Sequence, residues 1–281
     1  MHILLNGNFV SEIPSIHRGL SYGDGLFETM RLEQGRVVLW PYHLYRLERG
    51  FKQLQILEDI QNIEQEFLHF VDKLGTLGID SGVIKLRIIR GGEARAYAPE
   101  QDVSNWRIFE VFEGAVPWGK SETAIICEHK LPDNPNLAGI KHLNRLDQVL
   151  AAQEVTKSSN TTGLLLNTEG NLVCAIDSNI YIEKSGKIMT PPVDRAGVAG
   201  SFRNYMMDKL CSDLNIPLIE REINTQQLIK AEGLWLTNAV KGLRPVTHVE
   251  GVAAWQAPYS AQLCKLQSAA ANSLGVASVT N

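Results

Sequence analysis

Two periodicities alternate along the first part of the chain. After Pro41, which suits the first turn of a helix, apolar residues recur at spacings of three and four and predict a helix over residues 41–55. The same spacing predicts a second helix over residues 60–74. Alternation of apolar and charged residues between Ile84 and Ile88 then predicts a strand over residues 83–90, and another strand is expected over residues 106–112.

The second part of the chain repeats this mixture of periods. A helix is expected over residues 143–150, and helices near residues 201–214 and 258–272 flank an apolar strand at residues 233–237. Four more strands are expected, the last three as a meander, at residues 124–128, 163–167, 172–176 and 179–183. Interleaved helices and strands of this kind indicate an α/β or α+β fold class.

The length and the punctuation of the chain predict two domains. With roughly 150 residues to a domain, 281 residues correspond to about two. The best linker candidate is the segment 113–121, which is rich in glycine and proline. We therefore expect an N-terminal α/β domain over residues 1–116 and a C-terminal α/β domain over residues 117–281.

Composition and charge exclude several classes of protein. Hydrophobic residues make up 44% of the chain and charged residues 21%, which is ordinary for a globular protein and argues against disorder. A net charge of −4 argues against a broad nucleic-acid or anionic-membrane surface. No apolar run is long enough to span a membrane, and no basic leader opens the chain. The four cysteines form no CxxC pair, so neither a disulfide framework nor a metal site is expected, and a reduced, cytoplasmic protein is the simplest interpretation.

Lys141 is the first candidate for chemistry. It follows a turn-rich loop and lies among small and apolar residues, where a lysine is costly to bury without a use. A desolvated amine has a lowered pKa, so it can attack a carbonyl to form a Schiff base and can later carry protons. The alternative is an exposed lysine at the start of a helix.

Two other features could bind phosphate. Arg46 lies on the first predicted helix, where its guanidinium fork could pair with a phosphate group; otherwise it is one more exposed arginine. The glycine-punctuated segment 196–203 runs into a predicted helix, and the N–H groups at a helix start bind phosphate well. This segment could equally be an ordinary capped helix, with Ser201 near the N-cap.

Three segments, in this order, resemble the fold type IV family of pyridoxal-phosphate enzymes. They are Tyr22–Thr29, His43–Leu47 and Leu137–Leu150, and the similarity extends from Asn6 to about Val249. This family comprises branched-chain aminotransferases, D-amino acid aminotransferases and 4-amino-4-deoxychorismate lyases, and the chain is most similar to the lyase branch. The resemblance implies the two-domain architecture of the family, with pyridoxal phosphate in a cleft between the domains.

The resemblance also implies residue roles at the cofactor. Lys141 matches the lysine that forms a Schiff base with pyridoxal phosphate, and Arg46 matches the arginine that binds its phosphate. Ser201 and Phe202 match the helix-start positions whose main-chain N–H groups hold the phosphate. Asn238 lies in a further loop that lines the phosphate side.

On the substrate side, the resemblance implies three residues. Thr29 falls where lyase-type members carry a hydroxyl beside the substrate, which makes it a candidate catalytic residue. Arg95 and Tyr97 belong to the segment expected to bind the substrate carboxylates.

Cys174 departs from the family pattern. Members usually carry a glutamate five residues before the asparagine that corresponds to Asn179, where its carboxylate pairs with the protonated ring nitrogen of the cofactor. A thiol cannot stabilise that charge in the same way, so the cofactor is expected to withdraw electrons less strongly. Asp177 could replace the glutamate only through a shifted strand register together with a bulge.

The implied function is lysis of 4-amino-4-deoxychorismate to 4-aminobenzoate and pyruvate, as part of folate biosynthesis. Because the elimination creates an aromatic ring, it tolerates a weaker electron sink better than aminotransfer does. The alternatives are an aminotransferase of branched-chain or D-amino acids and a protein that binds pyridoxal phosphate without turnover. A homodimer with a small-molecule substrate is expected, without a nucleic-acid or membrane partner.

Overall fold

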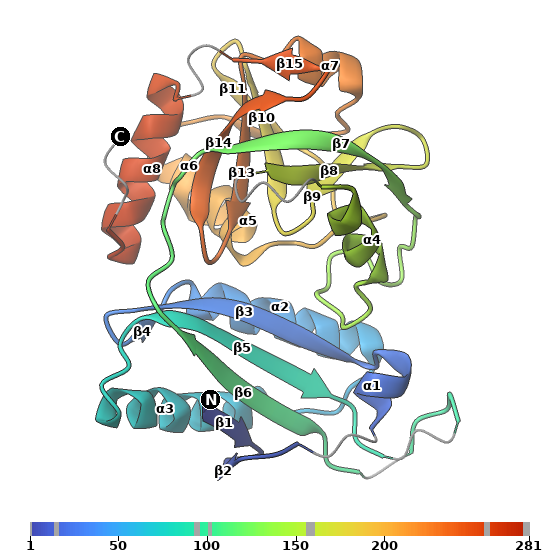
Figure 1. Cartoon of the computed structure of the whole chain (residues 1–281), viewed down its shortest axis with the longest axis vertical. Coiled ribbons are helices and arrows are strands. Elements are labelled where there is room, and N and C mark those ends of the chain that lie inside the picture. The colour runs from blue at the N-terminus through green and yellow to red at the C-terminus, as the bar shows by residue number, and fades with distance from the viewer. Residues whose placement is uncertain are drawn as a thin grey trace. The chain divides into compact units, whose positions relative to one another are not determined.

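A computed structural model describes residues 2–13, 17–92, 96–100, 103–155, 161–255 and 259–277. The chain forms two compact units (Figure 1). Unit 1 contains residues 1–116 and the short segment 140–144, and unit 2 contains residues 117–139 and 145–281. The linker segment 113–121 therefore contains the point where the first unit ends. The expected C-terminal domain included Lys141, whereas the segment 140–144 packs with unit 1.

Unit 1 is built on an antiparallel six-stranded sheet in the order β2-β1-β6-β5-β3-β4. Its strands are β1 (His2–Leu5), β2 (Asn8–Val10), β3 (Gly25–Glu33), β4 (Arg36–Val37), β5 (Gly82–Ile89) and β6 (Trp106–Glu113). Two-residue turns close the β1–β2 and β3–β4 hairpins, at Asn6-Gly7 and Gln34-Gly35. All four turn residues have positive φ, which matches the right-handed twist of the paired strands.

Helices cover one face of this sheet. The helices of unit 1 are α1 (Arg18–Tyr22), α2 (Trp40–Leu54) and α3 (Ile60–Thr76). Alternate residues of β5, including Leu86, are fully buried on the covered face. Phe70 of α3 packs there against Phe109 of β6, with 5.6 Å between the ring centroids. The opposite face of the sheet carries the other set of alternate residues, and these include Thr29 and Phe27.

Unit 2 contains a mixed nine-stranded sheet in the order β12-β11-β10-β13-β14-β7-β8-β9, with β15 beside β14. Its strands are β7 (Glu122–Leu131), β8 (Thr161–Asn167), β9 (Leu172–Ala175), β10 (Asn179–Lys184), β11 (Lys187–Thr190), β12 (Leu218–Glu220), β13 (Gly233–Asn238), β14 (Gly242–Val249) and β15 (Ala253–Ala254). The expected meander was wrong at one step, because β10 pairs with β11 and β13 and not with β9. Since β9 nevertheless contacts β10, the sheet curls.

Helices of very different length pack around this sheet. They are α4 (Leu146–Glu154), α5 (Ser201–Tyr205), the π-helical turn η1 (Met206–Leu210), α6 (Cys211–Asp213), α7 (Thr225–Ile229) and α8 (Ala261–Leu274). Helix α5, η1 and α6 follow one another without a break, and the first residues of this run are those that resemble a phosphate-binding helix start. Helix α4 contacts β7 and β8, and α8 contacts β14.

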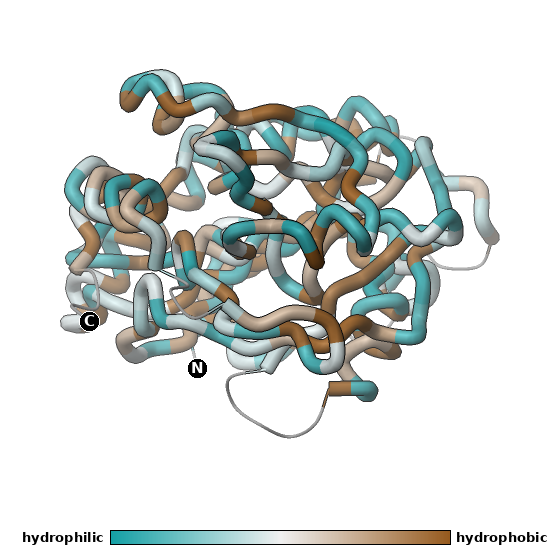
Figure 2. Tube along the Cα trace, turned by 90° about the horizontal axis from the view of Figure 1, so that it is seen from above, coloured by the Kyte–Doolittle hydropathy of each residue, from teal (hydrophilic) through white to brown (hydrophobic). Residues whose placement is uncertain are grey.

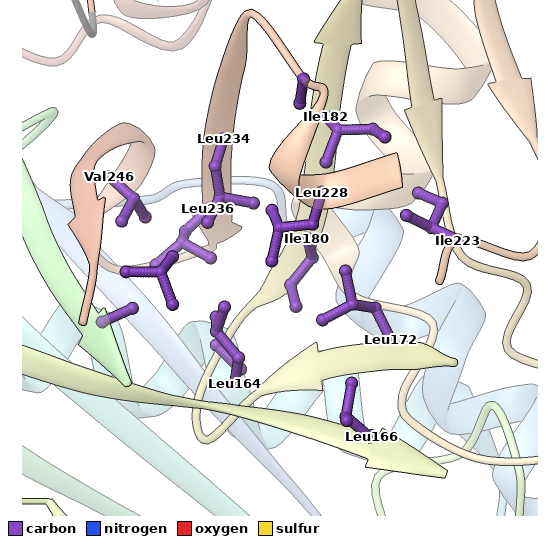
Figure 3. Close-up of a cluster of buried hydrophobic side chains, with 14 residues drawn as sticks. Leu164, Leu166, Leu172, Ile180, Ile182, Ile223, Leu228, Leu234, Leu236 and Val246 are labelled. Carbon is purple, nitrogen blue, oxygen red and sulfur yellow. The ribbon is translucent and has the colours of Figure 1, made fainter. Parts of the chain in front are cut away.

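Branched apolar side chains fill the interior of unit 2 (Figure 3). They come from strands on several sides of the curled sheet, from α7 and, for Ile223, from the connection between β12 and α7. The labelled members are Leu164, Leu166, Leu172, Ile180, Ile182, Ile223, Leu228, Leu234, Leu236 and Val246. Burying each such side chain contributes about 1.5–3 kcal/mol, so this core fixes the strands that present the loops described below.

The expected fold class is confirmed: the chain has a mixed α/β fold with long sheets and flanking helices. Hydrophobic and hydrophilic positions interleave along the trace (Figure 2). Among the described residues, no helix is both long and apolar enough to cross a membrane.

Candidate active site

Lys141 lies beside the first half of β3. The main chain of residues 141–143 runs antiparallel to β3, with bonds from the Phe27 N–H to the Lys141 carbonyl (2.9 Å) and from the Leu143 N–H to the Gly25 carbonyl (3.0 Å). Lys141 and Phe27 therefore project to the same face, and the ammonium Nζ lies 4.1 Å from the centroid of the Phe27 ring. This cation–π contact holds a half-buried lysine at one place on the sheet.

Thr29 shares this face with Lys141. Alternation along β3 directs Phe27 and Thr29 to the side of the sheet opposite the helices. The neighbouring strand adds Lys85, which is opposite Thr29 in the register, and Arg87, which is opposite Phe27. A hydroxyl and the cations of Lys85, Arg87 and Lys141 thus share one sheet face, where Arg87 pairs with Glu110 of β6 at 2.8 Å.

Arg46 lies in a buried charge cluster that the patterns in the sequence did not predict. The Glu28 carboxylate accepts a bond from Arg46 Nε (2.8 Å), pairs with Arg46 Nη2 and contacts His43 Nδ1 at 2.6 Å. Glu28 and His43 are fully buried, and Arg46 is nearly so. We call Glu28, His43 and Arg46 the Glu28 cluster.

The charges of the Glu28 cluster determine the protonation states of its members. Burial alone would raise the pKa of Glu28, but Arg46 and His43 outweigh it and hold this pKa at about 2. Burial lowers the pKa of His43, and the charges of Arg46 and Lys141 lower it further, although Glu28 opposes them. At neutral pH the cluster therefore contains a carboxylate, a guanidinium and a neutral imidazole.

Both missed residues had a sequence signal. Glu28 occupies an inward-facing position between Leu26 and Met30, where the alternation of β3 calls for an apolar residue. His43 precedes Arg46 by three positions and so lies on the same face of α2. Polar residues at two such positions in contacting elements are expected to find each other.

In unit 2, Cys174 lies on β9 and is buried. Burial raises the pKa of its thiol to about 12, so the side chain is neutral at physiological pH. Asp177 lies in the loop after β9, where its carboxylate contacts Ser178 Oγ, Lys241 and Arg244. Asp177 therefore does not replace the missing carboxylate at position 174, because its own carboxylate binds Ser178, Lys241 and Arg244.

Ser201 and Phe202 open helix α5, as expected, and the turn before them depends on a close contact. The Gly200 N–H donates to Asn179 Oδ1 (3.2 Å), and Asn179 Nδ2 donates to the Val198 carbonyl (2.8 Å). A Cβ at position 200 would lie only 2.1 Å from Asn179 Oδ1, so this position requires glycine. The first N–H groups of a helix have no acceptor within that helix, which suits this turn to an anion.

Asn238 uses its side chain within the protein. Its Oδ1 accepts from the N–H groups of Val240 (3.0 Å) and Lys241 (2.7 Å), and its Nδ2 donates to the Asp177 carbonyl (3.3 Å) and to Ser178 Oγ (3.2 Å). The side chain thereby shapes the β13–β14 loop. Any contact of this loop with a phosphate is expected from its main chain.

The substrate-side residues are described in part. Arg95 lies outside the described residues. Tyr97 is described, and its ring is highly exposed. The buried Arg18 donates to the carbonyls of Ala96 (2.9 Å) and Tyr97 (2.8 Å), and Asp24 holds the Nε of Arg18 at 2.9 Å. The main chain at Tyr97 is thus fixed while its side chain remains accessible.

Comparison with known proteins identifies the family. The sequence matches the amino-transferase class IV family over residues 25–249. It is 28% identical over 250 residues to an aminodeoxychorismate lyase of Vibrio harveyi, covering 87% of this chain and 90% of that protein. It is also 25% identical over 264 residues to a D-alanine aminotransferase of Listeria monocytogenes, covering 90% of this chain and 89% of that one.

A solved structure extends this similarity. The crystal structure of 4-amino-4-deoxychorismate lyase from Pseudomonas aeruginosa superposes with a TM-score of 0.87 and 33% sequence identity, covering 97% of this chain and 99% of that chain. The family match spans most of the chain, and the fold agrees over nearly all of it. The chain belongs to the amino-transferase class IV family, the fold type IV enzymes, whose cofactor is pyridoxal phosphate.

Proposed function

We propose that this protein is a pyridoxal-phosphate-dependent lyase that converts 4-amino-4-deoxychorismate to 4-aminobenzoate and pyruvate, a reaction of folate biosynthesis. The observation that carries the proposal is the similarity, over nearly the whole chain, to proteins named as aminodeoxychorismate lyases, at 28% and 33% identity. The position of Lys141 supports it as well, because the amine lies over Phe27 and shares one sheet face with the Thr29 hydroxyl. We also propose that the protein acts in the cytoplasm as a homodimer.

Both units contain side chains and main-chain groups of the kinds that pyridoxal phosphate needs. In unit 1, Lys141 supplies an amine and Arg46 a guanidinium whose orientation Glu28 fixes. In unit 2, the glycine turn before Ser201 and Phe202 supplies main-chain N–H groups at a helix start. We propose that these groups hold pyridoxal phosphate, with Lys141 at its aldehyde and the others at its phosphate.

When bound, the cofactor supplies an electron sink for charge that develops on the carbon next to the substrate amine. Lys141 Nζ then removes the proton from the amine-bearing carbon as the general base. The bond between the ring carbon and the enolpyruvyl oxygen breaks with its electron pair on oxygen, the six-membered ring becomes aromatic, and the departing enolate takes up a proton at its methylene carbon to become pyruvate. We propose that the Thr29 hydroxyl orients the substrate next to Lys141, and that Arg95 and Tyr97 bind its carboxylates.

A second candidate function is aminotransfer, because the family also contains aminotransferases. Cys174 favours the lyase over this candidate. Its buried thiol is neutral, whereas a carboxylate at that position would stabilise a protonated ring nitrogen. Elimination gains the stability of an aromatic product and so depends less on that charge.

The decisive experiment is an assay for 4-aminobenzoate from enzymatically generated 4-amino-4-deoxychorismate. The wild-type protein with pyridoxal phosphate is expected to form it, and Lys141→Ala is expected to lower the rate about a hundred- to ten-thousandfold. The exposed Lys73, on α3, provides the matched control, and Lys73→Ala should leave the rate unchanged. Absence of 4-aminobenzoate from the wild-type reaction would reject the lyase.

The balance between lysis and aminotransfer can be tested at one position. Cys174→Glu should raise the rate of amino-group transfer from D-alanine or leucine relative to the rate of 4-aminobenzoate formation. Cys174→Gln adds similar bulk without a charge and should leave the ratio of the two rates unchanged. Equal ratios in the Glu and Gln variants would contradict the role assigned to the thiol.

A further inference from the structure

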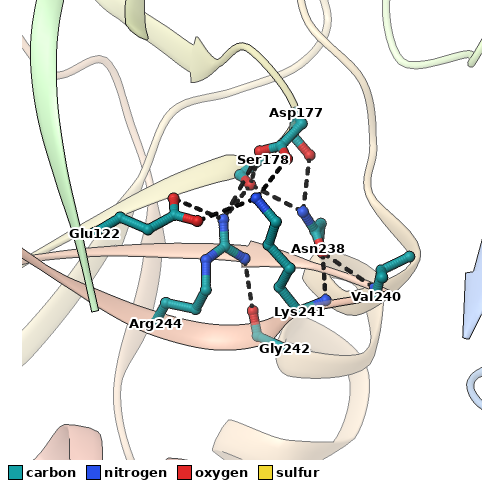
Figure 4. Close-up of polar contacts among 8 residues, drawn as sticks. All are labelled: Glu122, Asp177, Ser178, Asn238, Val240, Lys241, Gly242 and Arg244. Atoms are coloured by element: carbon teal, nitrogen blue, oxygen red, sulfur yellow. Dashed lines mark hydrogen bonds and ion pairs between the residues drawn. The ribbon is translucent and has the colours of Figure 1, made fainter. Parts of the chain in front are cut away.

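Four charged side chains in unit 2 form a cluster next to the β13–β14 loop (Figure 4). We call Glu122, Asp177, Lys241 and Arg244 the Arg244 cluster. Arg244 Nη2 donates to Ser178 Oγ (2.8 Å) and to Glu122 Oε2 (3.3 Å), and lies 3.7 Å from Asp177 Oδ1 in the same network. Lys241 Nζ contacts Glu122 Oε1 (3.1 Å) and Asp177 Oδ2 (3.2 Å).

The cluster joins two loops. Asp177 and Ser178 lie in the loop between β9 and β10, whereas Lys241 lies in the loop between β13 and β14. Arg244, on β14, also donates from Nη1 to the Gly242 carbonyl (3.2 Å). Together with the hydrogen bonds of Asn238, these side-chain contacts fix the β9–β10 loop to the β13–β14 loop.

The contacts continue to the start of α5. Ser178 is followed directly by Asn179, whose side chain binds the Gly200 N–H and the Val198 carbonyl. The position of Asn179 therefore determines where the turn before Ser201 lies. The aromatic ring of Trp118 connects the same two regions: it packs against Phe202, with 5.7 Å between centroids, and closely approaches Gly242.

Arg244 is buried, so the cluster is anchored inside unit 2 and is not a surface ion pair. Its side chain is only 1% exposed, and two carboxylates balance the charges of Arg244 and Lys241. The surrounding protein would raise the pKa of Asp177, but the charges of Lys241 and Arg244 outweigh this effect and keep that pKa below its usual range. Loss of Arg244 would leave Glu122 and Asp177 sharing a single cation.

We propose that the Arg244 cluster is a positioning device that sets the β9–β10 loop, the β13–β14 loop and the turn before Ser201 at the spacing needed to receive the cofactor's phosphate. The inference rests on the proposed function, since it assumes that pyridoxal phosphate binds at these loops. Arg244 touches no phosphate in this scheme and acts only through Ser178, Asn179 and Gly242.

The test separates phosphate binding from general stability. Dissociation constants for pyridoxal phosphate and for pyridoxal, which lacks the phosphate, are measured with the apoenzyme by fluorescence titration. Arg244→Met should weaken binding of pyridoxal phosphate about tenfold and leave pyridoxal binding nearly unchanged, because only the phosphate meets the loops. Lys241→Met removes the same charge from the more exposed of the two cations and should weaken binding of pyridoxal phosphate by no more than about threefold.

A double variant tests the charge argument. Glu122→Gln in the Arg244→Met background removes one of the two carboxylates left with a single cation, and should recover part of the lost affinity for pyridoxal phosphate. Glu122→Gln alone is the milder variant if Arg244→Met does not fold.

Several results would overturn the inference. Equal loss of affinity for both ligands in Arg244→Met, or no loss for either, would assign Arg244 a purely structural role or none. Wild-type protein that binds pyridoxal phosphate no better than pyridoxal would remove the premise about the phosphate. Failure of the proposed function is seen separately, as absence of 4-aminobenzoate from a protein that still prefers the phosphorylated ligand.

Discussion

The Glu28 cluster of unit 1 and the Arg244 cluster of unit 2 use similar side chains in different surroundings. In the Glu28 cluster every side chain is at most 7% exposed, and a single carboxylate serves both its neighbours. In the Arg244 cluster the arginine is 1% exposed, whereas Lys241 and Asp177 are 38% and 44% exposed. The first cluster is sealed, and the second opens to solvent on one side.

This difference determines what each charge contributes. A buried ion that loses its partner cannot recover its hydration, so the loss is expensive. A partly exposed ion is screened by water and exchanges its partner at little cost. The contacts differ in length as well, since Glu28 meets His43 at 2.6 Å and Arg46 Nε at 2.8 Å, whereas the ion pairs of the Arg244 cluster are 3.1–3.7 Å long. Surroundings and geometry should therefore order the effects of substitution in the same direction.

The largest effect is expected for Glu28→Gln. The variant keeps the size of the side chain but removes the buried carboxylate that pairs with Arg46 and His43, and unfolding should become easier by about 3–5 kcal/mol. Chemical denaturation measures the change. The control is Glu110→Gln, since Glu110 pairs with the half-exposed Arg87 and should cost less than about 1 kcal/mol. Equal losses in the two variants would break the comparison.

Arg244→Met should lower the free energy of unfolding by about 1–3 kcal/mol, which is less than the loss expected for Glu28→Gln. In this variant Lys241 still neutralises part of the charge of Glu122 and Asp177. The side chains of Lys241 and Asp177 also reach solvent, which screens the remaining charge. The measurement is again the denaturation midpoint and slope. A loss larger than that of Glu28→Gln would show that the open side of the cluster does not matter.

Acid should weaken the sealed cluster in two stages. The pKa of His43 is lowered in the folded protein, so its contribution is present above the ordinary histidine pKa of about 6.5 and is lost as the pH falls below that value. Glu28 has a folded pKa of about 2 against an ordinary 4.5, so its contribution is lost between those values. His43→Gln should abolish the first stage and keep the second, as seen in denaturation midpoints between pH 8 and about pH 2. An unchanged profile in the variant would assign the first stage to other groups.

The smallest effect is expected for Asp177→Asn. Its carboxylate and the Lys241 ammonium are both more than a third exposed, so the variant should lose less than about 1 kcal/mol of unfolding free energy. The loss should shrink further in high salt, because exposed pairs are screened. A salt-independent loss would indicate that Asp177 behaves as a buried ion.

Elements with a regular period were predicted closely. The helix expected over residues 41–55 is α2, Trp40–Leu54, and the strand expected over residues 83–90 is β5, Gly82–Ile89. In both, one face is buried against the rest of unit 1, so the pattern that burial imposes is visible in the sequence. The interior of unit 2 likewise arises from recognisable apolar strands.

Elements that depend on distant partners were not predicted. Strand β14, Gly242–Val249, carries Arg244 and Pro245, which interrupt its apolar pattern, yet β13 and β7 pair with it on both sides. The helix expected over residues 143–150 begins only at Leu146, because residues 141–143 pair with β3. Local periodicity carries no information about such pairing.

The candidate site divides in the same way. The family resemblance drew attention to Lys141 and Arg46, but it did not reveal what surrounds them. Glu28 became visible as the partner of Arg46 only when α2 packed on β3, and Arg244 only when two loops met. Glu28 and His43 lie inside the segments Tyr22–Thr29 and His43–Leu47 that carry the resemblance, but a motif does not say which of its residues meet, because the packing of α2 on β3 decides that.

The contact between Gly200 and Asn179 has a consequence for the tolerance of this chain to change. As long as position 179 carries asparagine, any side chain at position 200 would collide with its Oδ1. A library randomised at position 200 alone should therefore return glycine among functional clones. A library randomised at both positions should admit alanine or serine at 200 together with a smaller residue at 179. Position 200 can therefore be substituted only together with position 179, although the two sites are 21 positions apart in sequence.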